Sequence, residues 1–303
     1  MAEPIFNQPH FQDPDAARDY LESMRWANGV VCPHCGLIDK FYKLVGEAHR
    51  PGLYKCTDCS KQFSVTVGTV FEASKIKLHI WLQAAHLMSA SKKGISSKQL
   101  ERMLGVSYKT AWFMSHRIRE AMNIAPKEQL GQSAPVEVDE TYWGNVGKHA
   151  KGARSFHHKM KVVTLVERDG EKRSFHLPSV NHKTLFPIMQ GMIAKKARLM
   201  TDQAGVYEKI GPNFGTHEVV NHTLKEYARG DVTTNTVESS FAILKRGLYG
   251  TFHSVSEQHL QRYATEFDFR WNHRVALGVN DVQRTTAVLM NIEGKRLTYK
   301  GAT

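Results

Sequence analysis

Four cysteines stand as two close pairs in one short stretch, Cys32-Pro-His-Cys35 and Cys56-Thr-Asp-Cys59. Two such pairs, about 20 residues apart, let four thiolates converge on one tetrahedral zinc ion. His34 lies between two of the cysteines, but four thiolates complete the coordination, so we expect this histidine at the surface. A closed four-thiolate site leaves no position for water or substrate, so the predicted zinc is structural rather than catalytic.

Two aspartates end runs of residues that have the pattern of strands. Asp139 follows Val136 and Val138, and alternation points the two valines to one face of the strand and Asp139 to the other. Asp202 ends the apolar run that begins at Ala197, and Gln-Ala-Gly follows it as a turn sequence. The two carboxylates could therefore meet at the rim of one sheet.

A third acidic residue, Glu238, lies in a helix that we expect to begin between Thr233 and Asn235. Lys245 follows Glu238 seven residues later, and seven residues make almost two helical turns, so both side chains project from one face. Three carboxylates can hold two Mg²⁺ ions about 4 Å apart, as phosphoryl transfer on DNA requires. Taken one by one, such acids are more often solvated or ion-paired, so the pattern needs support from the rest of the chain.

A helical stretch before these acids predicts a helix-turn-helix. Residues 96–104 form the first helix, Gly105 the turn, and Ser107 the N-cap of a second helix. We expect the start of the second helix to meet base edges through Tyr108, Lys109 and Thr110, and its later residues to contact phosphates through His116, Arg117 and Arg119. The alternative is an ordinary three-helix bundle that packs Leu100, Leu104, Trp112 and Ile118.

The composition agrees with a nucleic-acid partner. The chain has 303 residues with 41 Lys and Arg against 29 Asp and Glu, a formal charge of +12, which favours binding to phosphates. No run approaches the roughly 20 apolar residues that span a bilayer. We therefore expect a soluble cytoplasmic protein that is not associated with a membrane.

The elements predict a multidomain α+β chain. We expect an α/β catalytic domain with a helical C-terminal part, because strand-like runs and helices alternate after residue 135 and helices dominate after Thr234. The predicted segments are an N-terminal helix (1–30), a zinc ribbon (31–72), a helix-turn-helix region (73–124), a linker (125–134), the catalytic domain (135–285) and a C-terminal tail (286–303).

Together these motifs resemble bacterial insertion-sequence transposases that have an N-terminal zinc ribbon, a helix-turn-helix and a DDE-type, RNase H-like catalytic domain. The resemblance covers nearly the whole chain. It rests on motifs in the family's order: CPHCG with CTDC, VDETYWG, MTDQAGVY and TNTVESSFAILKRGLYGTFHSVSEQHLQRYATEFDFRWNHR.

The resemblance implies that Asp139 and Asp202 are the first two metal ligands and that the helix with Asn235 and Glu238 supplies the third. Some relatives have Asn at the third position, and Asn235 lies one turn before Glu238 on the same face. We favour Glu238 because it adds charge and precedes Lys245 by seven residues. Residues expected along the DNA are Lys245 and Arg246, with His253, Arg270, Asn272 and Arg274 as secondary candidates.

The activity that the resemblance implies is cleavage at the terminal inverted repeats of an insertion sequence, followed by strand transfer into target DNA. The expected cofactors are one structural Zn²⁺ and two catalytic Mg²⁺ or Mn²⁺ ions. The expected partners are double-stranded DNA and further copies of the chain, as a homodimer or higher oligomer. Two alternatives stay open: a non-catalytic DNA-binding regulator derived from a transposase, and an RNase H-like nuclease that cuts without joining.

Overall fold

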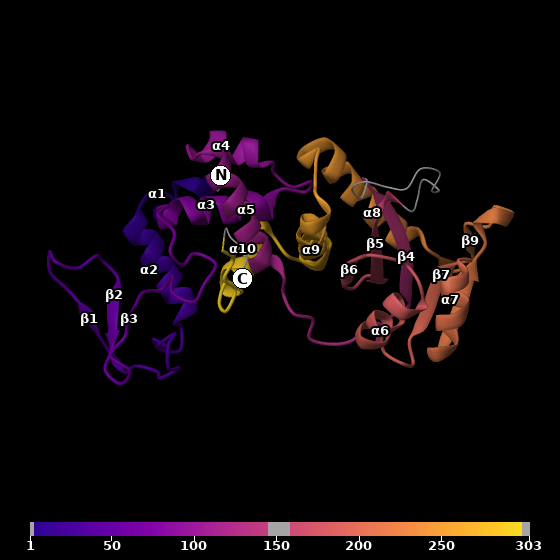
Figure 1. Cartoon of the computed structure of the whole chain (residues 1–303), viewed down its shortest axis with the longest axis horizontal. Helices are drawn as coiled ribbons and strands as arrows, with labels where there is room; N and C mark the ends of the chain where they lie inside the picture. The colour runs from indigo at the N-terminus through magenta and orange to yellow at the C-terminus, as the bar shows by residue number, and fades with distance from the viewer. Residues whose placement is uncertain (1–2, 145–157, 299–303) are drawn as a thin grey trace. The chain divides into compact units, whose positions relative to one another are not determined.

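The structure, a computed structural model, describes residues 3–144 and 158–298 and divides the chain into two compact units. Unit 1 contains residues 1–123 together with residues from 279 onward, and unit 2 contains residues 124–278. Unit 1 thus contains segments from both ends of the chain, and in Figure 1 the yellow helix α10 (Asp281–Met290) packs with the N-terminal helices. No helix of the described residues is long and apolar enough to cross a membrane.

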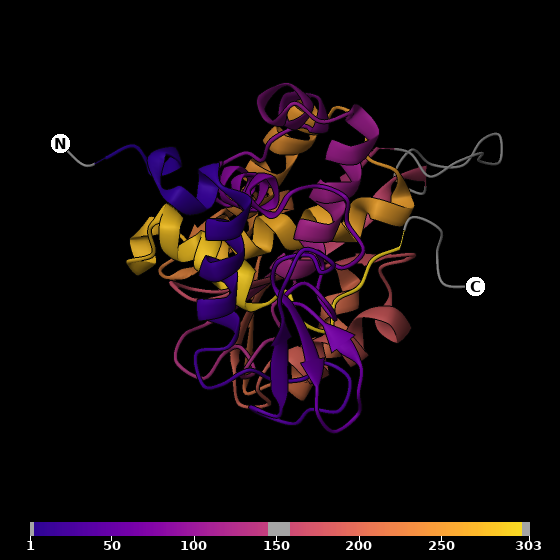
Figure 2. The same ribbon diagram turned by 90° about the vertical axis from the view of Figure 1, so that its left-hand side faces the viewer.

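Three short antiparallel strands form the cysteine ribbon of unit 1, in the order β1 (Phe41–Leu44), β2 (Leu53–Cys56) and β3 (Gln62–Phe63). Helix α2 (Pro14–Arg25) and these strands face the viewer in Figure 2. The buried rings of Trp26, Tyr54 and Phe63 pack edge to face or stacked, with centroids 5.2–6.0 Å apart. These aromatic contacts supply the small apolar core that a ribbon of this size needs besides the metal that the sequence predicts.

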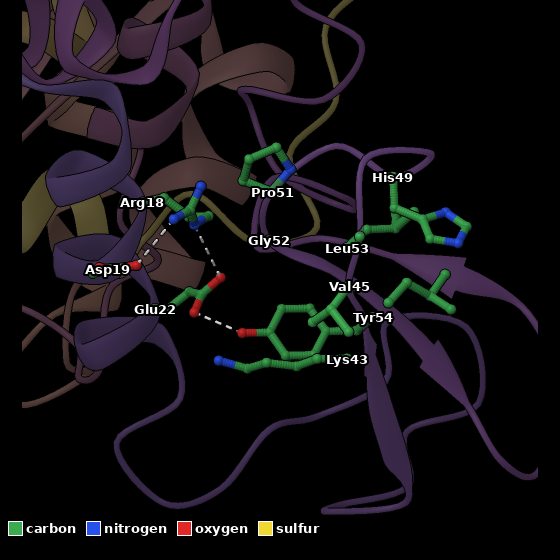
Figure 3. Close-up of a pocket in the computed structure, with 12 residues that line it drawn as sticks. Arg18, Asp19, Glu22, Lys43, Val45, His49, Pro51, Gly52, Leu53 and Tyr54 are labelled. Atoms are coloured by element: carbon green, nitrogen blue, oxygen red, sulfur yellow. Dashed lines mark hydrogen bonds and ion pairs between the residues drawn. The ribbon is translucent and has the colours of Figure 1, made fainter.

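A polar contact also joins helix α2 to the ribbon. The Tyr54 hydroxyl donates a 2.6 Å hydrogen bond to Glu22, and Arg18 lies 4.0 Å from the other oxygen of that carboxylate (Figure 3). Arg18 also pairs with Asp15 and Asp19 on the same helix. Burial, with the Glu22 hydrogen bond, raises the pKa of Tyr54 well above its ordinary value. The hydrogen bond between Tyr54 and Glu22 therefore joins the ribbon to α2.

Helices α3 (Leu78–Ala90), α4 (Ser97–Leu104) and α5 (Tyr108–Met122) follow the ribbon, and α10 packs on α3, where His86 contacts Thr285 at 2.9 Å. Ser96 and Ser107 cap α4 and α5 through their hydroxyls, and Gly105 ends α4 with a left-handed φ of 64°. The predicted glycine turn and the predicted N-cap Ser107 are thus confirmed. Shorter elements of unit 1 are η1 (Ile5–Asn7) and α1 (Pro9–Gln12).

Unit 2 is built on a five-stranded mixed sheet with the order β6-β5-β4-β7-β8. Its strands are β4 (Val136–Trp143), β5 (Met160–Glu167), β6 (Lys172–Leu177), β7 (Arg198–Asp202) and β8 (Thr216–Val220). The first three are antiparallel neighbours, whereas β7 runs parallel to β4 and β8 parallel to β7. Helix α6 (His182–Met192) makes the crossover before β7 that such a parallel strand requires.

The two faces of this sheet are covered by different helices (Figure 1). On one face, Val136, Val138 and Leu199 pack in a core with residues of α6 and α7 (Gly205–Ile210). On the other face lie α8 (Asn235–Gly247) and α9 (Glu257–Asn272). The remaining elements are η3 (Gly211–Asn213), η4 (His222–Leu224), β9 (Ala228–Arg229), β10 (Val232–Thr233), the π-helical η5 (Leu248–Phe252) and η6 (Val275–Leu277).

Side chains of α9 hydrogen-bond the outer edge of β6. The Gln261 amide donates to the Ser174 carbonyl and accepts from the His176 N–H. Asp268 accepts from the Ser174 N–H. Asn272 accepts from the Lys172 N–H and donates to the Lys172 carbonyl. These bonds satisfy polar groups that an edge strand otherwise exposes. Asn272, predicted as a secondary DNA contact, therefore has a structural role.

Two other secondary candidates, Arg270 in this helix and Arg274 two residues after its end, have partners within unit 2. Arg270 is 6% exposed and pairs with Glu266 inside α9. Arg274 donates to the carbonyl oxygens of Gly170 and Trp271. Both guanidinium groups therefore make contacts within unit 2.

Candidate active site and metal centre

The four cysteines converge in unit 1. The Sγ atoms of Cys32 and Cys59 are 3.7 Å apart, as are those of Cys35 and Cys56, and all four lie within 4.8 Å of one another. Four sulfurs arranged tetrahedrally at about 2.3 Å from a zinc ion would be about 3.8 Å apart. The residues therefore fit a zinc ion, as the sequence predicts.

Backbone turns place these thiols. The Gly36 N–H donates to the Cys32 carbonyl and the Cys56 N–H to the Lys61 carbonyl, and Gly36 has a φ of 78° that favours glycine. A hydrogen bond from the backbone of Cys59 is the main cause of a lowered pKa of Cys56, about 7. His34 is exposed, in agreement with the prediction that it does not complete the site, and His49 is exposed as well.

Asp139 and Asp202 lie side by side in unit 2. The parallel register pairs Val138 with Thr201, so the two aspartates come next on adjacent strands β4 and β7. Val136 and Val138 point into the α6 and α7 core, so Asp139 points to the face that α8 covers. The carboxylates accept backbone hydrogen bonds, Asp139 from the Glu140 N–H at 2.7 Å and Asp202 from the Ala204 N–H at 3.0 Å.

Glu238 enters from the first turns of α8. Its Oε1 accepts from the Thr234 hydroxyl at 2.8 Å and lies 3.5 Å from the His222 Nε2 atom, and the side chain is 45% exposed. Asn235, the alternative third residue, is exposed at the first position of α8. Lys245 and Arg246 follow on the same helix, Lys245 half-buried and Arg246 exposed.

The charges of the other two carboxylates act on Asp139. Burial, followed by repulsion from Glu140, Asp202 and Glu238, raises the pKa of Asp139 from 3.8 to about 8. Among the described residues, only the four cysteines have metal-binding atoms all within 4.8 Å of one another, so the carboxylates are more widely spaced than that. A cluster of hard oxygen ligands that repel one another fits a divalent cation, which would offset the repulsion.

Three neighbours of the acids were missed in the sequence. Glu140 points to the opposite face, where it accepts a 2.6 Å hydrogen bond from the Tyr207 hydroxyl, and burial raises its pKa. His222 contacts Glu238, and its backbone N–H donates to Gln203, the residue after Asp202. Glu137, fully buried, binds the start of α8. Only the acidic Glu-Val-Asp-Glu run itself could have suggested that more than one of its carboxylates is used.

Helix α5 carries the residues predicted to contact DNA, and the structure divides them. At the start of α5, Tyr108 and Lys109 are exposed and Thr110 is half-buried. The Lys98 ammonium lies 4.9 Å from the centre of the Tyr108 ring. The phosphate contacts predicted further along are corrected, because those residues are only 1–4% exposed: His116, Arg117 and Arg119.

Each of the two buried arginines has specific partners. Arg117 donates to the Glu72 carbonyl at 2.6 Å and lies over the rings of Trp81 and Phe113. Arg119 donates to the Ser115 hydroxyl. Helical periodicity places basic residues on a helix but does not reveal which face another segment covers.

The raised pKa of Asp139 predicts a pH-dependent stability. Because its pKa is higher in the folded protein than in the unfolded chain, the aspartate destabilises the fold increasingly as pH rises from about 4 to 8, and constantly above that. We expect Asp139→Asn to be about 1–3 kcal/mol more stable than the native protein at pH 8.5, with a smaller advantage at pH 5.5.

Urea unfolding without added divalent cation, monitored by hydrogen exchange in peptides of unit 2, measures this difference in stability. Using peptides of unit 2 alone separates its unfolding from that of the zinc ribbon. Asp169→Asn is the matched control, since Asp169 lies exposed in the turn between β5 and β6. A stability difference that does not grow with pH would contradict the burial of a charged Asp139.

Comparisons with known proteins agree with this division of the chain. A family model described as the ISXO2-like transposase domain matches residues 130–272, and one described as the transposase zinc-ribbon domain matches residues 12–62. A similar protein, described as an uncharacterized protein in transposable element ISH50 of Halobacterium salinarum, is 28% identical over 270 residues, which are 84% of this chain and 89% of that protein.

Proposed function

Because this chain belongs to the insertion-sequence transposases, we propose that it binds the terminal inverted repeats of such an element and catalyses metal-dependent strand cleavage and strand transfer. The observation that carries the proposal is the placement of Asp139 and Asp202 on adjacent parallel strands, on the face that the helix of Glu238 covers. Repulsion among these carboxylates supports a site that binds cations.

The fold of unit 2 supports an RNase H-like catalytic domain. The sheet order β6-β5-β4-β7-β8, with three antiparallel strands followed by two parallel ones, places Asp139 on the central strand and Asp202 at the end of its parallel neighbour. Ligand and metal sites of open α/β sheets lie outside the carboxyl ends of parallel strands. The acidic face is thus the expected place for a DNA end.

In the proposed mechanism, Asp139, Asp202 and Glu238 would hold two Mg²⁺ or Mn²⁺ ions. When bound, such ions activate the attacking oxygen and stabilise the leaving oxygen. Water attacks the phosphorus at the element's end, and the bond to the 3′ oxygen breaks to leave a 3′ hydroxyl. That hydroxyl then attacks a target phosphate in line. The bond from that phosphorus to the target strand's 3′ oxygen breaks and leaves a 3′ hydroxyl on the target, with no covalent protein intermediate. Lys245 and Arg246 contact DNA phosphates beside the reacting group.

The third ligand is Glu238 in this proposal, with Asn235 as the alternative. Glu238 adds a negative charge that Asp139 senses, which an amide would not supply. Asn235 donates its backbone N–H to the Thr233 hydroxyl and is exposed, so its side chain stays available for a secondary contact.

Unit 1 supplies DNA binding in the proposal. Helices α4 and α5, joined by the Gly105 turn, act as a helix-turn-helix whose second helix presents Tyr108, Lys109 and Thr110 to base edges. The formal charge of +12 favours the phosphate backbone. Pairing two ends of one element requires at least two copies of the chain on DNA.

The experiment incubates the purified protein with duplexes that end in the inverted repeats flanking its reading frame, a plasmid target, and Mg²⁺ or Mn²⁺. We expect nicked ends and covalently joined products, both dependent on the added cation. Nicking without joining would favour an RNase H-like nuclease. Binding without either reaction would favour a non-catalytic regulator, and both outcomes would overturn the proposal.

A further inference from the structure

The helix that carries Glu238 begins without a capping side chain of its own. Thr234 at its N-cap makes no side-chain cap hydrogen bond, yet each of the first four N–H groups has a partner. The Asn235 N–H donates to the Thr233 hydroxyl and the Glu238 N–H to the Thr234 carbonyl. The two N–H groups between them, of Thr236 and Val237, donate to a residue about 100 positions earlier.

That residue is Glu137 on β4. Its Oε2 accepts from the Thr236 N–H at 2.8 Å and from the Val237 N–H at 3.0 Å. Its Oε1 accepts from the Thr236 hydroxyl at 2.9 Å and from the Arg168 Nε at 2.7 Å. The side chain is 0% exposed, so a charged carboxylate is held at the positive end of the helix dipole with every oxygen satisfied.

Arg168 extends this contact to the chain that leads into the helix. Besides pairing with Glu137, its guanidinium donates to the carbonyl oxygen of Asp231 at 2.6 Å and to that of Thr233 at 3.1 Å. The arginine directly follows β5, the neighbour of β4. Strands β4 and β5 are thereby tied to both the approach and the first turn of α8.

The position of Glu137 links this contact to the acidic site. Glu137 precedes Asp139 by two residues on the same strand, so both point to the same face, about 7 Å apart along the chain. Val237, bound by Glu137, directly precedes Glu238. The contact therefore sets where the helix carboxylate stands relative to the strand carboxylate.

We propose that Glu137, neutralised by Arg168, is a positioning residue that fixes the spacing between Asp139 and Glu238 and thereby the affinity of the site for divalent cations. The proposal rests on the function proposed above only for the use of these cations in catalysis. Groups behind metal ligands typically change metal affinity or activity about 10- to 100-fold when they are altered.

The test compares Glu137→Gln with the native full-length protein, by Mn²⁺ titration followed by electron paramagnetic resonance without DNA. Gln keeps the shape but loses the charge and places an NH₂ group among N–H donors. We expect the Mn²⁺ concentration for half-saturation to rise at least 10-fold and hydrogen exchange at Thr236 and Val237 to accelerate. Strand transfer should weaken at low Mn²⁺ and recover as Mn²⁺ is raised.

Glu266→Gln is the matched control, because Glu266 is also 0% exposed and paired with an arginine, Arg270, but lies in α9. We expect this variant to lose stability without a change in Mn²⁺ half-saturation. A folded Glu137→Gln protein with native Mn²⁺ half-saturation, or one that only matches the control, would overturn the proposal.

If Glu137→Gln does not fold, Thr236→Val is used as the test variant. This substitution removes a single hydrogen bond to Glu137 and keeps the shape of the side chain. An increase of about threefold in Mn²⁺ half-saturation is expected, and no increase would overturn the proposal. Metal binding and amide exchange are measured without DNA. A protein that binds Mn²⁺ as expected but joins no ends would refute the proposed function and leave the positioning role standing.

Discussion

Asp139→Asn is expected to reduce strand transfer at least about 10³-fold while leaving affinity for the inverted repeats within about twofold. An amide removes one of the charges that hold the catalytic cations, and a cation supplies several kcal/mol of stabilisation to the phosphoryl-transfer transition state. Affinity for DNA is kept because Asp139 lies in the sheet of unit 2, whereas the predicted base contacts lie on α5 of unit 1. Joined products are measured on sequencing gels and affinity by fluorescence anisotropy.

Asp169→Asn is the matched control for this experiment as well, since it makes the same chemical change in an exposed turn of the same unit. It should retain native strand transfer. Substantial joining by Asp139→Asn would refute the catalytic assignment of the acidic site, and a parallel loss of DNA binding would point to misfolding instead of a lost ligand.

Zinc removal is the second large effect. Replacing both Cys32 and Cys35 with serine should reduce tightly bound zinc from about one per chain to near zero, because two of four thiolates are lost. Structural zinc contributes about 10–16 kcal/mol in zinc-finger peptides, far more than the small aromatic core of this ribbon supplies. We therefore expect strand β2 to lose protection from hydrogen exchange, and binding of the inverted repeats to weaken at least tenfold.

Metal analysis by mass spectrometry, together with hydrogen exchange of ribbon peptides, measures these changes. His34→Ala is the control, because His34 lies between the two cysteines but is exposed and outside the sulfur cluster. It should keep its zinc. An unchanged zinc content in the double serine variant would contradict the four-thiolate site.

The parts of the site that the sequence revealed are those encoded locally. Two cysteine pairs specify a tetrathiolate cluster by their spacing alone, and alternation in the Val-Glu-Val-Asp segment predicted that Asp139 faces away from Val136 and Val138. The apolar run ending at Asp202 and the helix start near Asn235 were visible in the same way. The RNase H-like and helix-turn-helix assignments stay predictions that the strand order and the capped helices support.

What the sequence did not reveal depends on contacts between distant residues. Glu137 shares the face of Asp139, but nothing local indicates that its partners are Arg168 and Thr236, 31 and 99 residues away. Arg117 looked like a phosphate ligand until its contact with Glu72, 45 residues earlier, placed it in the interior. Helix α10 likewise joins unit 1 through contacts such as that of His86 with Thr285, 199 residues apart.

Crystals of the protein with bound inverted-repeat DNA, prepared with Mn²⁺ and examined by anomalous scattering, test the central claim most directly. The account predicts Mn²⁺ peaks between Asp139, Asp202 and Glu238, with the Glu238 carboxylate rather than the Asn235 amide in the coordination sphere. Peaks held by Asn235 would revise the third ligand alone. Ordered DNA ends with no Mn²⁺ between Asp139 and Asp202 would contradict the account.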